Sequence, residues 1–123
     1  MEFNNSIPIY QQIGDIVKQK IIKGELKCGD KIKSVREFAE EVNVNPNTVQ
    51  RAFNYLEMEK ILYSERTSGR YVTKDAKIID ELKKNMICSI IKDFFHNMNQ
   101  MGIDEKECLN IISEYLKGDH KDE

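Results

Sequence analysis

The amino-acid sequence predicts a mainly α-helical protein with one small β-hairpin, and three observations support this fold class. Residues 34–59 carry two short helical patterns separated by a tight turn, residues 61–73 carry a hairpin pattern, and residues beyond 75 carry two amphipathic helical patterns. This order predicts a winged helix-turn-helix domain over residues 1–74, followed by a two-helix C-terminal dimerisation tail over residues 75–123.

The first predicted helix runs roughly from Ile9 to Lys23, where Gly24 suits the left-handed conformation that ends many helices. Its apolar residues recur at helical spacing and predict one buried stripe: Ile9, Ile13, Ile16, Val17 and Ile21. We expect this helix to cover the back of the helix-turn-helix. Leu26 and Ile32 lie in the segment that connects this helix to the second one, and they should hold that connecting segment against the β-hairpin, or wing, predicted further along the chain.

The second predicted helix begins at a capping box. The hydroxyl of Ser34 can accept from the amide of Glu37, while the Glu37 carboxylate reaches back to the start of the helix. Four apolar residues then follow at three- and four-residue spacing: Val35, Phe38, Ala39 and Val42. Asn43 tolerates the left-handed conformation and should end this helix. The result is a short amphipathic helix followed by a tight turn.

The third predicted helix has an outward face that suits DNA recognition. Asn45 is a good N-cap and Pro46 suits the first helical position. The buried stripe consists of Val49, Ala52, Phe53 and Leu56, and the opposite face presents Pro46, Asn47, Gln50, Arg51 and Asn54, with Thr48 beside them. Amide and guanidinium groups can read base edges in the major groove. The alternative is a polar helix in a small bundle.

A β-hairpin, which is the wing of the predicted winged helix-turn-helix, follows this helix. Residues 61–63 form an apolar run, residues 65–69 form a polar turn, and residues 70–73 are rich in strand formers. The predicted tip consists of Arg66, Thr67, Ser68, Gly69 and Arg70. Glycine between cationic side chains permits close approach to phosphate. A solvated turn is the alternative.

The predicted tail has two helices with a large apolar surface. A long helix begins after Asp75 and ends near Gly102, and a shorter one is capped by Asp104 with Glu107 and ends at Gly118. We expect these helices to form a four-helix homodimer through Ile79, Leu82, Met86, Ile87, Ile90, Ile91, Phe94, Phe95, Met98, Leu109, Ile112, Tyr115 and Leu116. The alternative is packing of the tail on its own winged-helix domain.

The charge distribution is uneven. The whole chain has a formal net charge of −2, which divides into +2 over residues 1–74 and −4 over residues 75–123. Few cations are available per subunit, so DNA binding should be modest and should depend strongly on salt. A dimer would double their number.

Composition disfavours several other classes of protein. The sequence offers no nucleophile motif, no glycine-rich phosphate loop and no paired cysteine or histidine ligands, so we expect no enzyme, no metal and no cofactor. Cys28, Cys88 and Cys108 should be free thiols, with a redox sensor as the less favoured alternative. No membrane span or signal peptide is expected, and a cytoplasmic location follows. A small-molecule effector stays open, because a cavity near Phe94 and Tyr115 could admit an apolar ligand.

Several segments of the sequence resemble the N-terminal domain of GntR-type bacterial transcription regulators. They are residues 8–13 (PIYQQI), 22–26 (IKGEL), 29–32 (GDKI), 34–39 (SVREFA) and 44–53 (VNPNTVQRAF). The NPNTVQR version with a short tail is similar to the YtrA subfamily. The resemblance implies DNA contacts from Arg36, Asn45, Asn47, Thr48 and Gln50 and from the wing near Gly69.

The sequence departs from the family pattern at several positions. Lys33 replaces a frequent proline and Lys60 a frequent glycine, while Pro46 and Gln50 stand where many relatives have other residues. Operator preferences of relatives therefore do not transfer to this sequence.

The residues and the resemblance together predict a sequence-specific DNA-binding regulator. We expect a dimeric repressor at an inverted-repeat operator, of the kind that often controls a transporter operon in the YtrA subfamily. The predicted DNA-binding residues are Lys33, Ser34, Arg36, Asn45, Pro46, Asn47, Thr48, Gln50, Arg51, Asn54, Arg66, Ser68, Gly69 and Arg70. The alternative from another class is a winged-helix module that binds a protein through the same face.

Overall fold

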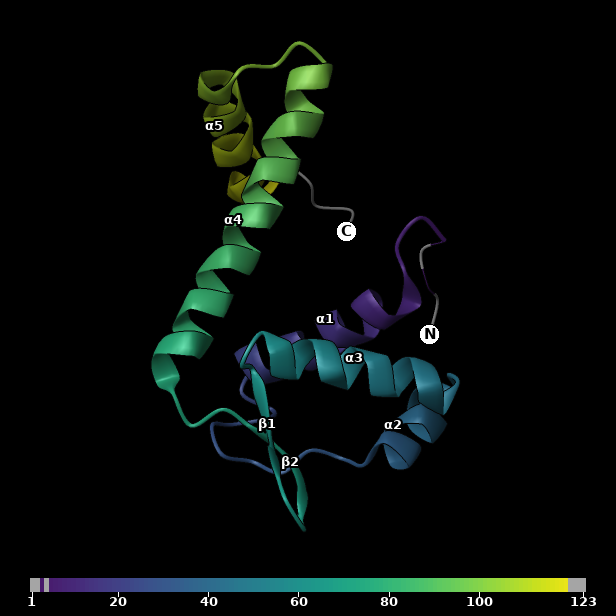
Figure 1. The fold of residues 1–123 in the computed structure, drawn as a ribbon. Helices are drawn as coiled ribbons and strands as arrows, with labels where there is room; N and C mark the ends of the chain where they lie inside the picture. Colours follow the sequence, from purple (N-terminus) through teal and green to yellow (C-terminus); the bar gives the residue numbers. More distant parts are fainter. Residues whose placement is uncertain (1–2, 4, 120–123) are drawn as a thin grey trace. The chain divides into compact units, whose positions relative to one another are not determined.

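The computed structural model describes residue 3 and residues 5–119, and its chain divides into two compact units with the boundary after Lys83 (Figure 1). The elements are α1 (Ile9–Ile22), α2 (Val35–Val42), α3 (Pro46–Met58), β1 (Leu62–Glu65), β2 (Gly69–Val72), α4 (Ala76–Gln100), α5 (Glu105–Glu114) and a final π-helical turn (Tyr115–Asp119). The predicted mainly α-helical fold with one hairpin is confirmed.

The first unit has one hydrophobic core centred on α3, which contacts α1, α2 and β1. The core is formed by Ile13, Val17, Ile21, Ile32, Phe38, Ala39, Val42, Val49, Ala52, Phe53, Leu56, Ile61, Leu62 and Val72. The predicted stripes of the three helices therefore meet one another. Ile9 was expected in this core but is exposed, because it is the first residue of α1.

The helix-turn-helix has the predicted caps. The Ser34 hydroxyl accepts from the Glu37 amide at 3.1 Å, and the Glu37 carboxylate accepts from the Ser34 amide at 3.0 Å. Asn43 ends α2 with φ of 56°, and the Asn45 side chain caps α3 by accepting from the Asn47 amide at 2.8 Å. These local contacts fix the turn that sets the direction of α3.

The hairpin pairs β1 with β2 antiparallel, and Ser64 lies opposite Arg70. The connecting segment adds backbone bonds to β2, from the Gly29 amide to the Val72 carbonyl at 2.9 Å and from the Ile32 amide to the Arg70 carbonyl at 3.0 Å. The expected contact of this segment with the wing is thus confirmed. Gly69 and Arg70 were predicted at the tip, but they begin β2 instead.

Lys60 adopts a conformation that favours glycine. Its φ is 65°, and it connects α3 to the buried residue Ile61. The left-handed region disfavours a side chain with a Cβ atom. The replacement of a frequent glycine by lysine therefore leaves the backbone of this corner in the conformation that glycine adopts.

The start of α4 belongs to the first unit. Ile78, Ile79 and Leu82 are partly buried and pack against the winged-helix core. Two of them, Ile79 and Leu82, were predicted in a dimer interface; within the single chain they already pack against the core of the first unit, and their part in a dimer stays a prediction. For the same reason the compact units separate inside α4, rather than before it as the sequence suggested.

The second unit contains the later turns of α4 and α5, which runs back alongside them (Figure 1). The Asp104 side chain caps α5 by accepting from the Glu107 amide at 2.8 Å, as predicted. Cys108 is the buried residue of α5. Burial raises the pKa of its thiol, and the carboxylates of Glu105, Asp104 and Glu107 raise it further. Within the described part of the chain, no helix is both long and apolar enough for a membrane span.

Candidate nucleic-acid interface

The outward face of α3 carries the amides that the sequence singled out. Val49 and Ala52 are fully buried and fix the rotation of the helix. Asn47 and Asn54 are exposed and Gln50 is half-buried on the other side. Helical spacing of three and four residues places these three side chains in one row. This row makes α3 the candidate recognition helix, because its side chains can meet base edges.

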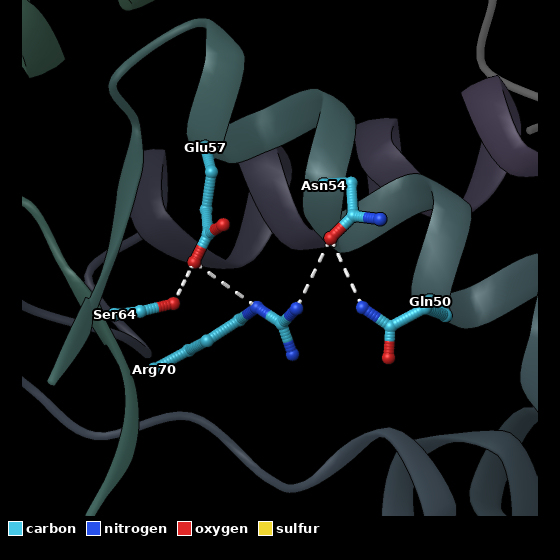
Figure 2. Close-up of polar contacts among 5 residues, drawn as sticks. All are labelled: Gln50, Asn54, Glu57, Ser64 and Arg70. Carbon is cyan, nitrogen blue, oxygen red and sulfur yellow. Dashed lines mark hydrogen bonds and ion pairs between the residues drawn. The ribbon is translucent and has the colours of Figure 1, made fainter. Parts of the chain in front are cut away.

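A chain of polar contacts joins this row to the hairpin (Figure 2). Arg70 donates through Nη2 to Asn54 Oδ1 at 3.1 Å and through Nε to Glu57 Oε1 at 3.2 Å. Gln50 Nε2 donates to the same Asn54 oxygen at 3.0 Å, and the Ser64 hydroxyl donates to Glu57. Arg70 thus lies against α3 rather than at the wing tip, where the sequence had placed it.

Arg70 is partly shielded from solvent. Its side chain is 20% exposed and that of Glu57 is 28% exposed, and the guanidinium carbon lies 5.5 Å from the centre of the Phe53 ring. Partial burial strengthens an ion pair relative to one in water. The positive charge of Arg70 is therefore compensated inside the domain.

Arg51 points to another part of the domain. Its guanidinium carbon lies 4.0 Å from the centre of the Tyr10 ring of α1, and Tyr10 packs edge-on against Tyr55 of α3 at 5.9 Å. Such a cation–π contact contributes about 0.5–1 kcal/mol at an exposed site. In this structure Arg51 stabilises the α1–α3 contact, and its predicted contact with DNA stays a prediction.

A groove lies between the start of α2 and the wing. Its lining includes Lys31, Lys33, Ser34, Glu37, Ser68, Gly69 and Arg70. At Gly69 the backbone has φ of 116°, and a Cβ atom would lie 3.2 Å from Cε of Lys31. A side chain here would be strained and crowded, so glycine lets the wing approach the connecting segment closely.

The cations in the groove lining and next to it in the sequence differ in whether an acidic side chain pairs with them. Lys33 Nζ lies 2.8 Å from Glu41 Oε2, and this hydrogen bond lowers the pKa of the Glu41 carboxyl. Arg36 and Arg66 are exposed and form no ion pair with any other residue that the structure describes. Lys31, which lines the groove, is also exposed and likewise forms no ion pair with the other described residues.

The amino-acid sequence of residues 9–72 matches the model of the family described as bacterial regulatory proteins, gntR family. This segment is more than half of the chain, and it begins with α1 and ends with β2. The chain belongs to the GntR family. Its members are DNA-binding transcriptional regulators with a winged helix-turn-helix, and the family is not an enzymatic one.

The GntR relatives include short proteins of similar length. The chain is 38% identical to the HTH-type transcriptional repressor YtrA of Bacillus subtilis, over 97% of this chain and 95% of that protein. It is 36% identical to the uncharacterised regulator YhcF of the same organism, over 95% and 97%. The alignments include the tail, so they support the predicted place in the YtrA-like subfamily.

Solved structures extend this similarity to the fold. A GntR family transcriptional regulator from Listeria monocytogenes has a TM-score of 0.85 and 35% identity, covering 91% of this chain and 98% of that one. The DNA-binding domain of AraR in complex with operator ORR3 has a TM-score of 0.53 and 26% identity, covering 59% and 86%. The second structure is a domain of this fold bound to DNA.

Sequence reasoning missed three residues that shape the site. Glu57, Ser64 and Tyr10 were not among the predicted functional residues, yet they hold Arg70 and Arg51 in place. Glu57 follows Asn54 by three residues on the same helix, so its place in the polar row could have been found from spacing. Ser64 and Tyr10 had no such local signal.

Proposed function

We propose that this GntR protein is a dimeric repressor that binds an inverted-repeat operator. The observation that carries the proposal is the row of amides on the exposed face of α3, held in one orientation by the core on one side and by the hairpin on the other. A transporter operon is the class of target that the YtrA resemblance suggests.

The proposed DNA contacts come from three elements of the first unit. Arg36 at the start of α2 suits a phosphate or a nearby guanine, because a guanidinium can serve either. Asn47, Thr48, Gln50 and Asn54 would face the major groove, with Asn45 and Pro46 at the start of α3 beside them. Arg66, Ser68 and Gly69 of the wing, with Lys33 and Ser34 across the groove, would contact the backbone.

The proposed dimer uses apolar surface of the second unit. Residues Ile87, Ile90, Ile91, Phe94, Leu109, Tyr115 and Leu116 are all exposed there, with exposed fractions from 37% to 74%. Met86, Phe95, Met98 and Ile112 are half-buried beside them. An apolar area of this kind is typical of an interface. A second copy would bury it symmetrically and give two recognition helices.

Selection of bound sequences from a random DNA pool tests the proposal. We expect an inverted repeat with half-sites centred about 10 base pairs apart, because two-fold symmetric dimers place recognition helices about one turn apart. Enrichment of single, unpaired half-sites would contradict the dimeric arrangement, and no enrichment would contradict sequence-specific recognition.

Gln50→Ala distinguishes recognition of a specific base by Gln50 from non-specific electrostatic binding to DNA. The variant should lose about 1–3 kcal/mol on the selected site and should relax the preference at one base pair. The control is Gln19→Ala, which makes the same substitution at an exposed position of α1. Equal losses of Gln50→Ala on operator and random DNA would contradict a reading role for this residue.

A further inference from the structure

We propose that Arg70 is a positioning residue for base recognition: from the hairpin, it determines which end of the Asn54 and Gln50 side-chain amides faces the DNA. The inference rests on the proposed role of the α3 face. It assigns to Arg70 a part in specificity in place of a phosphate contact.

The orientation of Asn54 follows from the chemistry of its neighbour. A guanidinium group has five N–H donors and no acceptor. The amide atom that meets Arg70 Nη2 at 3.1 Å must therefore be oxygen, since two donors facing each other would repel. Asn54 is then left with its Nδ2 group, which offers two N–H donors, for any partner outside the domain.

The orientation of Gln50 follows in turn from that of Asn54. Asn54 Oδ1 can only accept, so the Gln50 atom that meets it at 3.0 Å must be the nitrogen. One N–H of Gln50 is used in this contact. Gln50 keeps Oε1 and its second N–H, the pair of groups that matches N6 and N7 of adenine in the major groove.

The chain of contacts therefore predicts a specific pattern of groups. Asn54 presents donors, which match the acceptors of guanine or thymine, and Gln50 presents one acceptor with one donor, which match adenine. Without Arg70 both amides could rotate by half a turn and exchange these groups. One cation on the hairpin thus selects a single hydrogen-bonding pattern on the helix.

Arg70 is itself held firmly enough for this task. Its Nε lies 3.2 Å from Glu57 Oε1, and Ser64, which lies opposite Arg70 in the hairpin, donates to the same carboxylate. The guanidinium also faces the Phe53 ring, a side chain of the core. Hydrogen bonds in a partly shielded chain reinforce one another. A side chain fixed in this way is poorly placed to reach a phosphate.

The test compares Arg70→Met and Arg70→Lys with Arg66→Met, which removes an exposed cation of the wing tip. Each protein is titrated with the selected wild-type operator and with random DNA at several salt concentrations, and its base preferences are selected again from a random pool. Arg70→Met should bind the operator about 5- to 150-fold more weakly, the loss expected for one bidentate contact. Its affinity for random DNA and its salt slope should stay at the wild-type values.

The two other variants complete the pattern. Arg70→Lys should retain the base preferences, because an ammonium group also only donates. Arg66→Met should weaken binding to operator and random DNA equally, and should lower the salt slope by about 0.9 if it loses one phosphate contact.

Two results with Arg70→Met would overturn the inference. One is equal weakening of Arg70→Met on both DNAs with a lower salt slope, which indicates a phosphate contact. The other is an Arg70→Met protein that retains every base preference. Should Arg70→Met fail to fold, Asn54→Ala breaks the same chain at an exposed position, and it should relax the preference at the Gln50 base pair as well as at its own. An Asn54→Ala protein that leaves the Gln50 preference intact would also overturn the inference. A wild-type protein without any base preference would instead contradict the proposed function.

Discussion

Replacing Ile90 by aspartate tests whether the exposed face of α4 forms a dimer. Ile90 is 68% exposed in the single chain, so the substitution changes little in the fold of the subunit. Full burial of an isoleucine side chain contributes about 1.5–3 kcal/mol, so the part still exposed has about 1–2 kcal/mol left to gain. A two-fold interface contains the residue twice, which brings the loss to about 2–4 kcal/mol per dimer.

This loss should raise the Kd of the dimer by about 30- to 700-fold, since 1.4 kcal/mol corresponds to a factor of ten. Burial of two unpaired carboxylates would increase it further. Sedimentation equilibrium over a range of protein concentrations measures the Kd, and circular dichroism checks that the helices are retained. Operator affinity should fall in parallel, because one subunit alone has few cations for DNA.

The matched control is Asn85→Asp, which adds the same charge at an exposed position of α4 that lies about 140° around the helix from Ile90. This variant should dimerise like the unmodified protein. An Ile90→Asp protein with an unchanged Kd would refute the proposed interface. So would an intact protein that sediments as a monomer at micromolar concentration.

Three further outcomes are expected. Ser34→Ala should lower the free energy of unfolding by about 0.5–2 kcal/mol in urea denaturation, because it removes the cap of α2. The hydrogen bond from the Ser34 amide lowers the pKa of the Glu37 carboxyl, so the stabilisation by that carboxylate should be complete at neutral pH and lost as the pH falls through the lowered pKa. Glu37→Gln should lack that part of the pH dependence of Tm. Lys60→Gly should raise the free energy of unfolding by about 0.5–1 kcal/mol by relieving the positive φ, and Lys60→Ala, which cannot, serves as its control.

The parts of the fold that the sequence predicted are those that depend on contacts between residues close together in the chain. Ser34 and Glu37 are three positions apart, and Asn45 caps the helix that begins with the next residue. Contacts of this range need only the helix itself, so a pattern of residue types is enough to find them. The buried stripes of α1, α2 and α3 were predictable for the same reason.

The details that sequence did not predict depend on residues far apart in the chain. Arg70 forms a hydrogen bond with Asn54, which lies 16 positions earlier in the chain. The direction of the Arg70 side chain depends on the register of the hairpin and on the turn that connects α3 to β1. Arg51 stacks on Tyr10 only because α1 lies beside α3. Ile79 and Leu82 were expected at a dimer interface because their pattern shows that they are apolar but does not show which surface covers them. Spacing identifies the face of an element, and packing decides its partner.

The contact between Arg70 and Asn54 has an evolutionary consequence. Two positions that share one hydrogen bond cannot change independently without loss of the pattern that they present. A descendant protein that acquires a new operator by replacing Asn54 should therefore also replace Arg70, and the two positions should covary among close relatives. Arg66 forms no ion pair with the other described residues, so position 66 should vary independently of positions 54 and 70.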